Sequence, residues 1–284
     1  MEKAIKKYFP IFLLPTMIAF AIGFIVPFVY GIFLSFCKFT TVTDWKWKGL
    51  QNYSRIFFVN GKLDTTFIHS LWYTALFTLV SVLIINVISF LIAMALTKGI
   101  RGTNLFRTVF FLPFTTSVTA GAIIWAYLFS DIYAPIFGVV SPLYTADTTV
   151  LAMAIMASWR DMGYTMLIYI AALQTISMDY YEAATVEGAN RWQQFIHITI
   201  PMIVPAFTTN ITLILAWGLR TFDLPAVVSQ TRPEGQTTAY YIYNQIFQAK
   251  GASVGQAAAI LLTIILIVLT QIVTRVLRRL EVEA

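Results

Sequence analysis

Six long apolar runs alternate with shorter polar segments along the chain, and this alternation is the strongest pattern in the sequence. Each run extends over at least about 20 residues, which as an α-helix is enough to cross roughly 30 Å of hydrocarbon. We therefore predict six membrane-spanning helices. They lie at Ile11–Phe36, Ile68–Leu96, Thr108–Phe129, Thr148–Gln174, Ile200–Thr221 and Ala257–Leu277.

The composition agrees with this pattern. Hydrophobic residues make up 58% of the chain and charged residues only 11%, whereas a soluble domain averages about 25% charged residues. The sequence thus predicts an all-α integral membrane protein. We expect residues 1–66 to form the first membrane helix and an outer loop, and residues 67–284 to form a five-helix core.

The distribution of basic residues predicts the orientation of the chain. Ten lysines and arginines flank the spans on one side of the membrane, mostly in short loops, and seven lie on the other side. Because short cytoplasmic loops carry the excess of basic residues, both termini are predicted to be cytoplasmic. The net charge of +6 therefore does not require a nucleic-acid partner.

Most motifs of enzymatic chemistry are absent from the sequence. Cys37 is the single cysteine, so an internal disulfide is excluded, and no phosphate-binding G-x-x-x-x-G-K-[ST] loop is present. His69 and His197 are expected near opposite faces of the membrane, where they cannot act as a pair. We expect neither catalytic residues nor a metal site.

Charged residues within the spans are candidates for a polar path. Arg160 and Asp161 lie near the centre of the fourth span, where a charge costs about 2.5–3.5 kcal/mol and normally faces a bundle interior or water. Neighbouring residues project about 100° apart on a helix, so these two are not expected to be simply each other's partner. Arg220 and Asp223 are three apart and could pair. For Arg160 a purely structural role is the alternative, whereas for Arg220, near the outer end of its span, a structural role is expected and the polar path is the alternative.

The polar segment between the fourth and fifth spans has the pattern of a helix-turn-helix. Residues 178–187 can form a short helix that Gly188 ends, because glycine accepts the left-handed conformation. Asn190 can then cap a second helix, and Pro201 suits the first turn of the fifth span. We predict a compact cytoplasmic element tied to both spans. The alternative is a connecting loop without a partner.

This segment resembles the EAA motif of permease subunits from binding-protein-dependent ABC importers. The resemblance is to the carbohydrate subclass, which includes the maltose, multiple-sugar and glycerol-phosphate systems. Other matches extend over most of the chain and include 49-GLQNY-53, 106-FRTVFFLPF-114, 171-AALQTIS-177 and 221-TFDLP-225. The motif positions are Glu182, Ala183, Ala184, Gly188 and Ala189, followed by Phe195, Ile198 and Pro201.

The resemblance implies a type I ABC importer permease fold in the cytoplasmic (inner) membrane of a bacterium or archaeon. It implies that the EAA loop, at about residues 178–200, is a coupling helix that docks on a cytoplasmic ATPase. A second permease subunit, two ATPase domains and an extracytoplasmic solute-binding protein are the expected partners, with the permease pair as a heterodimer. ATP and Mg²⁺ would bind the ATPase, and no cofactor is expected in this chain. The expected coupling residues are Glu182, Ala183, Ala184, Glu187, Gly188 and Ala189.

The resemblance makes a sugar or oligosaccharide the expected cargo, because aromatic faces and polar groups suit sugar rings. An anionic solute such as glycerol phosphate is the alternative, since basic residues lie in or beside the spans. An ion-coupled secondary transporter is a remote alternative, as neither a carboxylate cluster nor an inverted repeat is visible. Residues 229–235 depart from the glycine-rich sequence common in the family, which leaves docking of the binding protein open there. The candidate path residues are Trp159, Arg160, Tyr164, Trp217 and Arg220.

Overall fold

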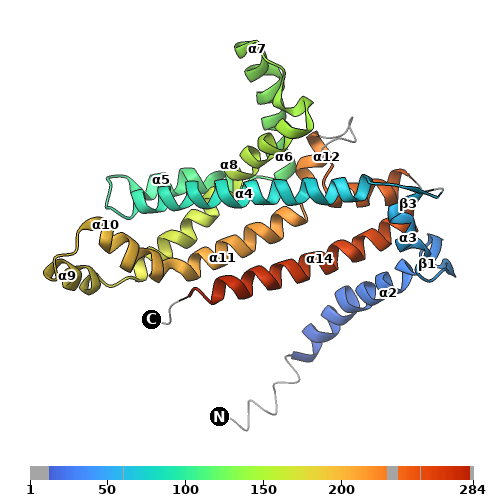
Figure 1. The fold of residues 1–284 in the computed structure, drawn as a ribbon, viewed down its shortest axis with the longest axis horizontal. Helices are drawn as coiled ribbons and strands as arrows, with labels where there is room; N and C mark the ends of the chain where they lie inside the picture. The colour runs from blue at the N-terminus through green and yellow to red at the C-terminus, as the bar shows by residue number, and fades with distance from the viewer. Residues whose placement is uncertain (1–12, 60, 229–235, 250, 282–284) are drawn as a thin grey trace, which may run out of the picture. The chain divides into compact units, whose positions relative to one another are not determined.

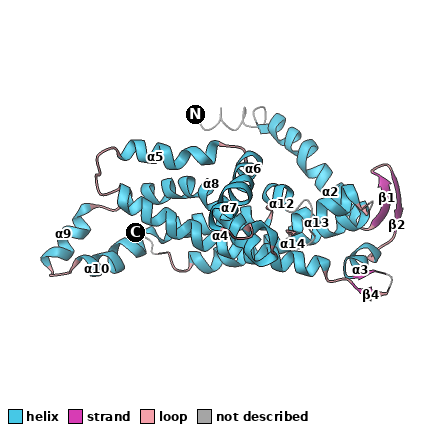
Figure 2. Cartoon of the chain, turned by 90° about the horizontal axis from the view of Figure 1, so that it is seen from above, coloured by secondary structure: helices cyan, strands magenta, loops and turns pink. Residues whose placement is uncertain are grey.

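The computed structural model describes residues 13–59, 61–228, 236–249 and 251–281. Helices dominate, and the strands are confined to two short hairpins (Figures 1 and 2). The long helices are α2 (Val26–Ser35), α4 (Thr66–Leu96), α5 (Thr103–Phe111), α6 (Val118–Tyr127), α8 (Ala146–Thr175), α11 (Ile200–Leu219) and α14 (Ala252–Arg278). The short helices are α3 (Gln51–Phe57), α7 (Ala134–Phe137), α9 (Met178–Val186), α10 (Arg191–Gln194), α12 (Asp223–Val228) and α13 (Thr238–Tyr243). The strands are β1 (Cys37–Thr41), β2 (Asp44–Trp47), β3 (Phe58–Val59) and β4 (Lys62–Leu63).

The chain forms two compact units. One consists of Met1–Phe67 with Tyr241–Thr263, and the other of Ile68–Tyr240 with Ile264–Ala284. The first unit contains α2, both hairpins and the start of α14, while the second contains the remaining long helices.

Within the described residues, five helical segments are long and apolar enough to cross a membrane. They are Leu13–Ser35, Thr66–Leu96, Val118–Phe137, Arg191–Val228 and Ala252–Arg278. The predicted fourth span corresponds to α8, which has 30 residues and is therefore about 45 Å long. Its hydropathy is lowered by the central Arg160 and Asp161. The six-span count and the cytoplasmic termini stay predictions.

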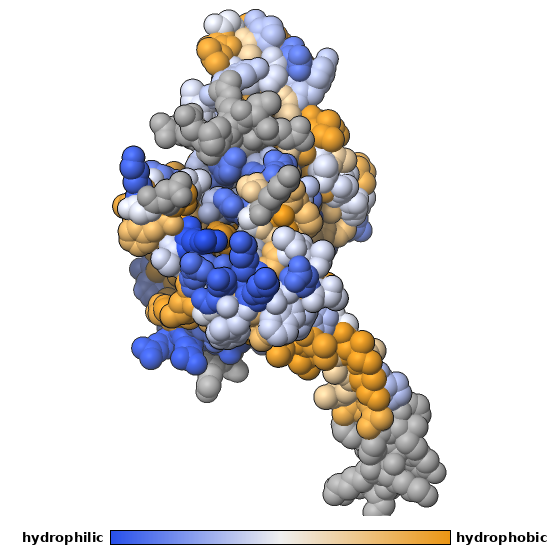
Figure 3. Space-filling model, turned by 90° about the vertical axis from the view of Figure 1, so that its right-hand side faces the viewer, coloured by the Kyte–Doolittle hydropathy of each residue, from blue (hydrophilic) through white to orange (hydrophobic). Residues whose placement is uncertain are grey.

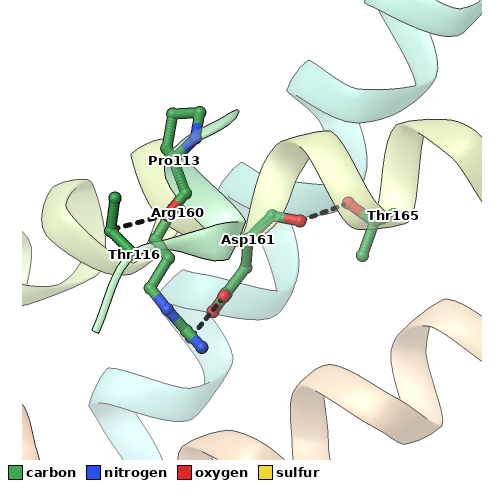
Figure 4. Close-up of polar contacts among 5 residues, drawn as sticks. All are labelled: Pro113, Thr116, Arg160, Asp161 and Thr165. Atoms are coloured by element: carbon green, nitrogen blue, oxygen red, sulfur yellow. Dashed lines mark hydrogen bonds and ion pairs between the residues drawn. The ribbon is translucent and has the colours of Figure 1, made fainter. Parts of the chain in front are cut away.

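The predicted third span, residues 108–129, is wrong in both bounds and continuity. The chain forms α5, a 3-10 turn at Leu112–Thr115, and then α6, which runs on through a π-helical turn at Leu128–Tyr133 into α7. Pro113 lacks the N–H that would continue α5, and Ser117 adopts a non-helical conformation with φ −59° and ψ 136°. The Thr116 hydroxyl donates to the Pro113 carbonyl oxygen at 2.7 Å (Figure 4). The hydrophobic run therefore does not form a single helix.

Small residues allow the helices of the second unit to approach closely. A Cβ atom on Gly163 of α8 would lie 2.7 Å from the Phe110 carbonyl carbon and 2.7 Å from the Phe111 Cα. A Cβ atom on Gly218 of α11 would lie 2.6 Å from Oγ1 of Thr78 on α4. Because lipid tails give little hydrophobic drive for helix association, such close packing is what holds membrane helices together.

Buried polar side chains also join α4, α8 and α11. The Tyr169 hydroxyl donates to Oδ1 of Asn86 at 2.5 Å, and the hydroxyls of Ser89 and Thr165 are 2.5 Å apart. Nδ2 of Asn210 donates to the Thr165 carbonyl oxygen at 3.2 Å. All five residues are buried. These hydrogen bonds fix the relative positions of the three helices.

Tyr169→Phe is expected to lower the free energy of unfolding by about 1 kcal/mol, the scale of a hydrogen bond between membrane helices, because Oδ1 of Asn86 loses its donor. The midpoint of thermal unfolding of the purified chain in detergent measures this effect. Tyr127→Phe is the matched control, since the Tyr127 side chain is exposed. Equal midpoints for the two variants would show that the network does not contribute to stability.

Candidate functional site

A cavity of about 380 Å³ opens within the second unit between α4, α6, α8, α11 and α12. Four of the five predicted path residues line it, namely Trp159, Arg160, Trp217 and Arg220. The fifth, Tyr164, does not line the cavity but stacks on Phe114, which does. The lining also contains residues that the sequence reasoning did not select, including Ser81, Phe114, Thr221 and Asp223.

Aromatic side chains form one wall of the cavity. The ring of Phe114 stacks on that of Tyr164 with centroids 4.7 Å apart and an angle of 22° between planes. Trp217 closes the cluster, with its centroid 6.1 Å from that of Phe114 and 5.7 Å from that of Tyr164. The break after α5 places Phe114 here, because it lies in the 3-10 turn at Leu112–Thr115. No helical periodicity in the sequence could have indicated that position.

Arg160 and Asp161 form an ion pair, so the prediction that they are not each other's partner is wrong. Nη1 of Arg160 lies 2.6 Å from Oδ1 of Asp161, and Figure 4 shows the two side chains pointing toward each other. The long arginine side chain bends around the helix and bridges the angle between neighbouring positions. The guanidinium carbon also lies 5.2 Å from the centroid of the Phe114 ring. Asp161 is buried and Arg160 half-buried.

Arg220 and Asp223 do not form the predicted pair, because the chain leaves the helical path between them. Arg220 ends α11 with φ −108° and ψ 13°, and Asp223 opens the separate helix α12. Asp223 instead accepts a hydrogen bond from the hydroxyl of Thr119 on α6 at 3.2 Å. The cavity lining thus includes two arginines and two aspartates, and its formal charges balance.

The segment at residues 178–199 forms the helix-turn-helix that the sequence predicts. Ser177 accepts a hydrogen bond from the N–H of Asp179 at the start of α9. At the end of α9, the N–H of Ala189 donates to the Ala184 carbonyl oxygen at 2.9 Å, and that of Gly188 donates to Thr185 at 3.0 Å. This pair of bonds is the Schellman motif, and Gly188 adopts the left-handed φ of +86° that it requires.

Asn190 caps α10 as predicted. Its Oδ1 accepts from the N–H groups of Trp192 and Gln193, each at 3.0 Å, while the Gln193 side chain accepts from the N–H of Asn190 at 2.8 Å. Pro201 lies in the first turn of α11, as predicted. A π-helical turn at Phe195–Thr199 joins α10 to α11 without a break, so Pro201 lies at the change from π- to α-helix.

The helix-turn-helix is fastened to the membrane helices by both polar and aromatic contacts. The hydroxyls of Tyr181 and Thr199 are 2.9 Å apart, and Nε2 of Gln194 donates to Oγ1 of Thr185 at 2.8 Å. The ring of Phe195 stacks on that of Phe90 in α4, with centroids 6.3 Å apart. The two short helices project beyond the ends of α8 and α11 (Figure 1). The two short helices are therefore tied to α4 through Phe195 and to the π-helical turn before α11 through Tyr181.

The EAA positions have unequal surroundings within this element. Glu182, Ala183, Glu187 and Gly188 are exposed, while Ala184 and Ala189 are half-buried. A second cavity of about 360 Å³ opens between α9 and the start of the π-helical turn, and its lining includes Ala184, Glu187, Gly188 and Ala189. The turn at Gly188 therefore presents small residues and a carboxylate together at one surface. Across the described part of the chain, no group of three or more His, Cys, Asp or Glu side chains could hold a metal ion.

Comparisons with known proteins agree with this fold over nearly the whole chain. A family model described as "Binding-protein-dependent transport system inner membrane component" matches residues 85–281. The probable starch degradation products transport system permease protein AmyD of Thermoanaerobacterium thermosulfurigenes is 32% identical, covering 96% of this chain and 94% of that protein. The arabinooligosaccharides transport system permease protein AraP of Bacillus subtilis (strain 168) is 28% identical, covering 94% of this chain and 88% of that protein.

The fold also matches a solved structure. The crystal structure of a bacterial ABC transporter involved in the import of the acidic polysaccharide alginate contains a chain with a TM-score of 0.81 and 23% identity, and the match covers 98% of each chain. This likeness confirms the predicted type I permease fold. The chain therefore belongs to the family of inner membrane components, or permeases, of binding-protein-dependent ABC transport systems, and it is a multi-pass protein of the inner membrane.

Proposed function

We propose that this chain forms the translocation path for a neutral sugar or oligosaccharide in an ATP-driven importer. The observation that carries the proposal is the cavity in the second unit, where an aromatic wall faces polar groups whose formal charges balance. Sugar rings present apolar faces to aromatic side chains and hydroxyls to polar ones. The relatives named for starch degradation products and arabinooligosaccharides support the same class of cargo.

The charge balance favours a neutral cargo over the anionic alternative. A site for glycerol phosphate needs cations that the protein itself leaves unpaired. Asp161 already neutralises Arg160 at 2.6 Å, and Asp223 adds a second negative charge to the lining near Arg220. An anion in this cavity would face two arginines, of which Arg160 is already engaged, and two carboxylates.

The same proposal assigns the helix-turn-helix to coupling with a cytoplasmic ATPase. ATP binding on that partner would move α9 and α10, and the contacts of Tyr181 and Phe195 would carry the movement to the helices around the cavity. Rigid-body rocking around a central site is the expected alternating-access movement. A second permease subunit and an extracytoplasmic binding protein complete the proposed assembly, with ATP and Mg²⁺ on the ATPase. How residues 229–235 meet the binding protein lies outside the described residues.

Trp217→Ala is expected to reduce ATP-driven uptake of labelled neutral oligosaccharides into vesicles about tenfold. Loss of an aromatic contact of about 1.5 kcal/mol corresponds to roughly that factor. Trp217→Phe should retain most of the uptake, because it keeps an aromatic face beside Phe114. Trp72→Ala is the matched control, since Trp72 lies on α4 and is 69% exposed.

Two outcomes of this assay would contradict the proposal. Equal losses in Trp217→Ala and Trp72→Ala would mean that the aromatic wall does not contact the cargo. Competition by glycerol phosphate but not by neutral oligosaccharides would mean that the cargo is anionic.

A further inference from the structure

The centre of α8 carries two adjacent charged residues, which are rare within a membrane helix. Figure 3 shows the usual case, because the helical segment Leu13–Ser35 presents a continuous hydrophobic surface, drawn in orange. An ionisable side chain within a span is costly and therefore usually has a function. Arg160 and Asp161 both line the cavity of the second unit. The pair is thus a candidate for a role beyond folding.

The charge of Arg160 is neutralised at close range by a single carboxylate. Nη1 of Arg160 lies 2.6 Å from Oδ1 of Asp161. The guanidinium carbon lies 5.2 Å from the centroid of the Phe114 ring, which places the cation beside the aromatic wall. Nε of Arg160 is buried and has no hydrogen-bond partner among the described residues. Without the charge of Asp161, Arg160 would therefore be a cation with an unsatisfied donor next to the wall proposed to hold sugar rings.

The other two charged residues of the lining have a weaker influence. They are Arg220 and Asp223, and both are exposed. Water and salt screen exposed charges, whereas charges in an enclosed site act strongly. The side chains of Arg160 and Asp161 are only 24% and 8% exposed. The balance between these two residues thus decides the charge that a cargo in the cavity meets at short range.

We propose that Asp161 makes this cavity select neutral sugars over acidic ones, an inference that rests on the proposed function. A uronic acid ring has the shape of a neutral hexose ring, except that a carboxylate replaces the hydroxymethyl group. Aromatic contacts with Trp217 do not distinguish the two rings. Asp161 does, because it already engages the guanidinium of Arg160 and repels a second carboxylate.

The test measures the binding of labelled sugars to the intact transport complex in lipid nanodiscs. The binding protein is left out, so that only the membrane cavity selects. The probes are maltotriose, a derivative whose terminal hydroxymethyl group is oxidised to a carboxylate, and a derivative with an amine at that position. Asp161→Asn is expected to raise the affinity for the carboxylate derivative relative to maltotriose about tenfold, the scale of one hydrogen bond to a charged group.

Arg160→Gln tests the proposal from the opposite side. It leaves the carboxylate of Asp161 unpaired and should raise the relative affinity for the amine derivative about tenfold as well. Thermal unfolding of each variant checks that it folds, and this variant provides the test if Asp161→Asn does not fold.

Three further variants are the controls. Arg160→Gln/Asp161→Asn removes both charges and should keep the native preference for maltotriose. Asp161→Glu retains the carboxylate and should also keep it. Asp223→Asn removes a carboxylate from the same lining at an exposed position. It should change the relative affinities less than about threefold, because its charge is screened.

Two results would overturn the proposal. Unchanged relative affinities in both Asp161→Asn and Arg160→Gln, with maltotriose still bound, would mean that the pair has a structural role alone. Equal gains for the carboxylate derivative in Asp161→Asn and Asp223→Asn would assign the selection to the total charge of the cavity. Failure of the proposed function gives a different result, namely maltotriose binding that is absent or that Trp217→Ala leaves unchanged.

Discussion

Gly163→Ala is expected to prevent normal folding, with a loss of about 3 kcal/mol or more in the free energy of unfolding. The added Cβ atom would enter the backbone at Phe110 and Phe111, and a backbone cannot rotate away as a side chain can. Separating α8 from the end of α5 would also move Phe114 and so disturb the aromatic wall. The measurement is the amount of protein in the membrane together with the midpoint of thermal unfolding.

Gly121→Ala is the matched control for this experiment. It adds the same methyl group to a buried helical glycine, but the nearest atom to its Cβ would be Cζ3 of Trp159 at 3.5 Å, an ordinary contact distance. We expect Gly121→Ala to accumulate at the native level. If both alanine variants accumulate normally, the close approach between α8 and α5 is not required for the fold.

Gly188→Val is expected to lower ATP-driven transport about tenfold while leaving the level of the protein in the membrane unchanged. A β-branched residue at φ +86° is strained by roughly 1–2 kcal/mol, and about 1.4 kcal/mol corresponds to a factor of ten. The strain would open the Schellman turn and displace α9 from α10 without touching the membrane helices. Transport into vesicles and the ATPase activity stimulated by the cargo measure the effect.

The control at the same position is Gly188→Asn. Asparagine tolerates the left-handed conformation far better than valine, and a Cβ atom added at this position would have no neighbouring atom within 4 Å. Gly188→Asn should therefore keep most of the transport. Equal losses in both variants would show that side-chain bulk at the surface matters rather than the shape of the turn.

The helix-turn-helix at residues 178–199 could be predicted almost residue by residue, because its structure is local. Each signal in residues 178–194 acts over a few positions, namely a glycine with positive φ and an asparagine cap. The long apolar runs likewise indicated the membrane helices, since length and hydropathy alone decide whether a helix can span a bilayer.

The cavity was less predictable, because it depends on departures from regular helices. The break at Pro113 brings Phe114 into the wall, and the end of α11 at Arg220 separates this residue from Asp223. A helical wheel assumes continuous helices and short side chains, so it also missed the bend of Arg160 onto Asp161. Four of the candidate residues nevertheless line the cavity. For Arg160 and Arg220 the reason is that charged side chains within spans are rarely placed toward lipid.

The most direct test of the account is a cross-link between the helix-turn-helix and an ATPase subunit. Val186 is the residue to label, because it is 90% exposed at the end of α9, and the native Cys37 is buried. The tagged Val186→Cys chain would be purified in mild detergent after treatment with a thiol cross-linker, and its cross-linked partner identified.

Val140→Cys, at a position that is 73% exposed between the third and fourth spans, is the control. We expect an ATPase subunit to be joined to Val186→Cys but not to Val140→Cys, and a second permease to co-purify. A chain that purifies alone, forms no such cross-link and transports in vesicles without ATP would contradict it.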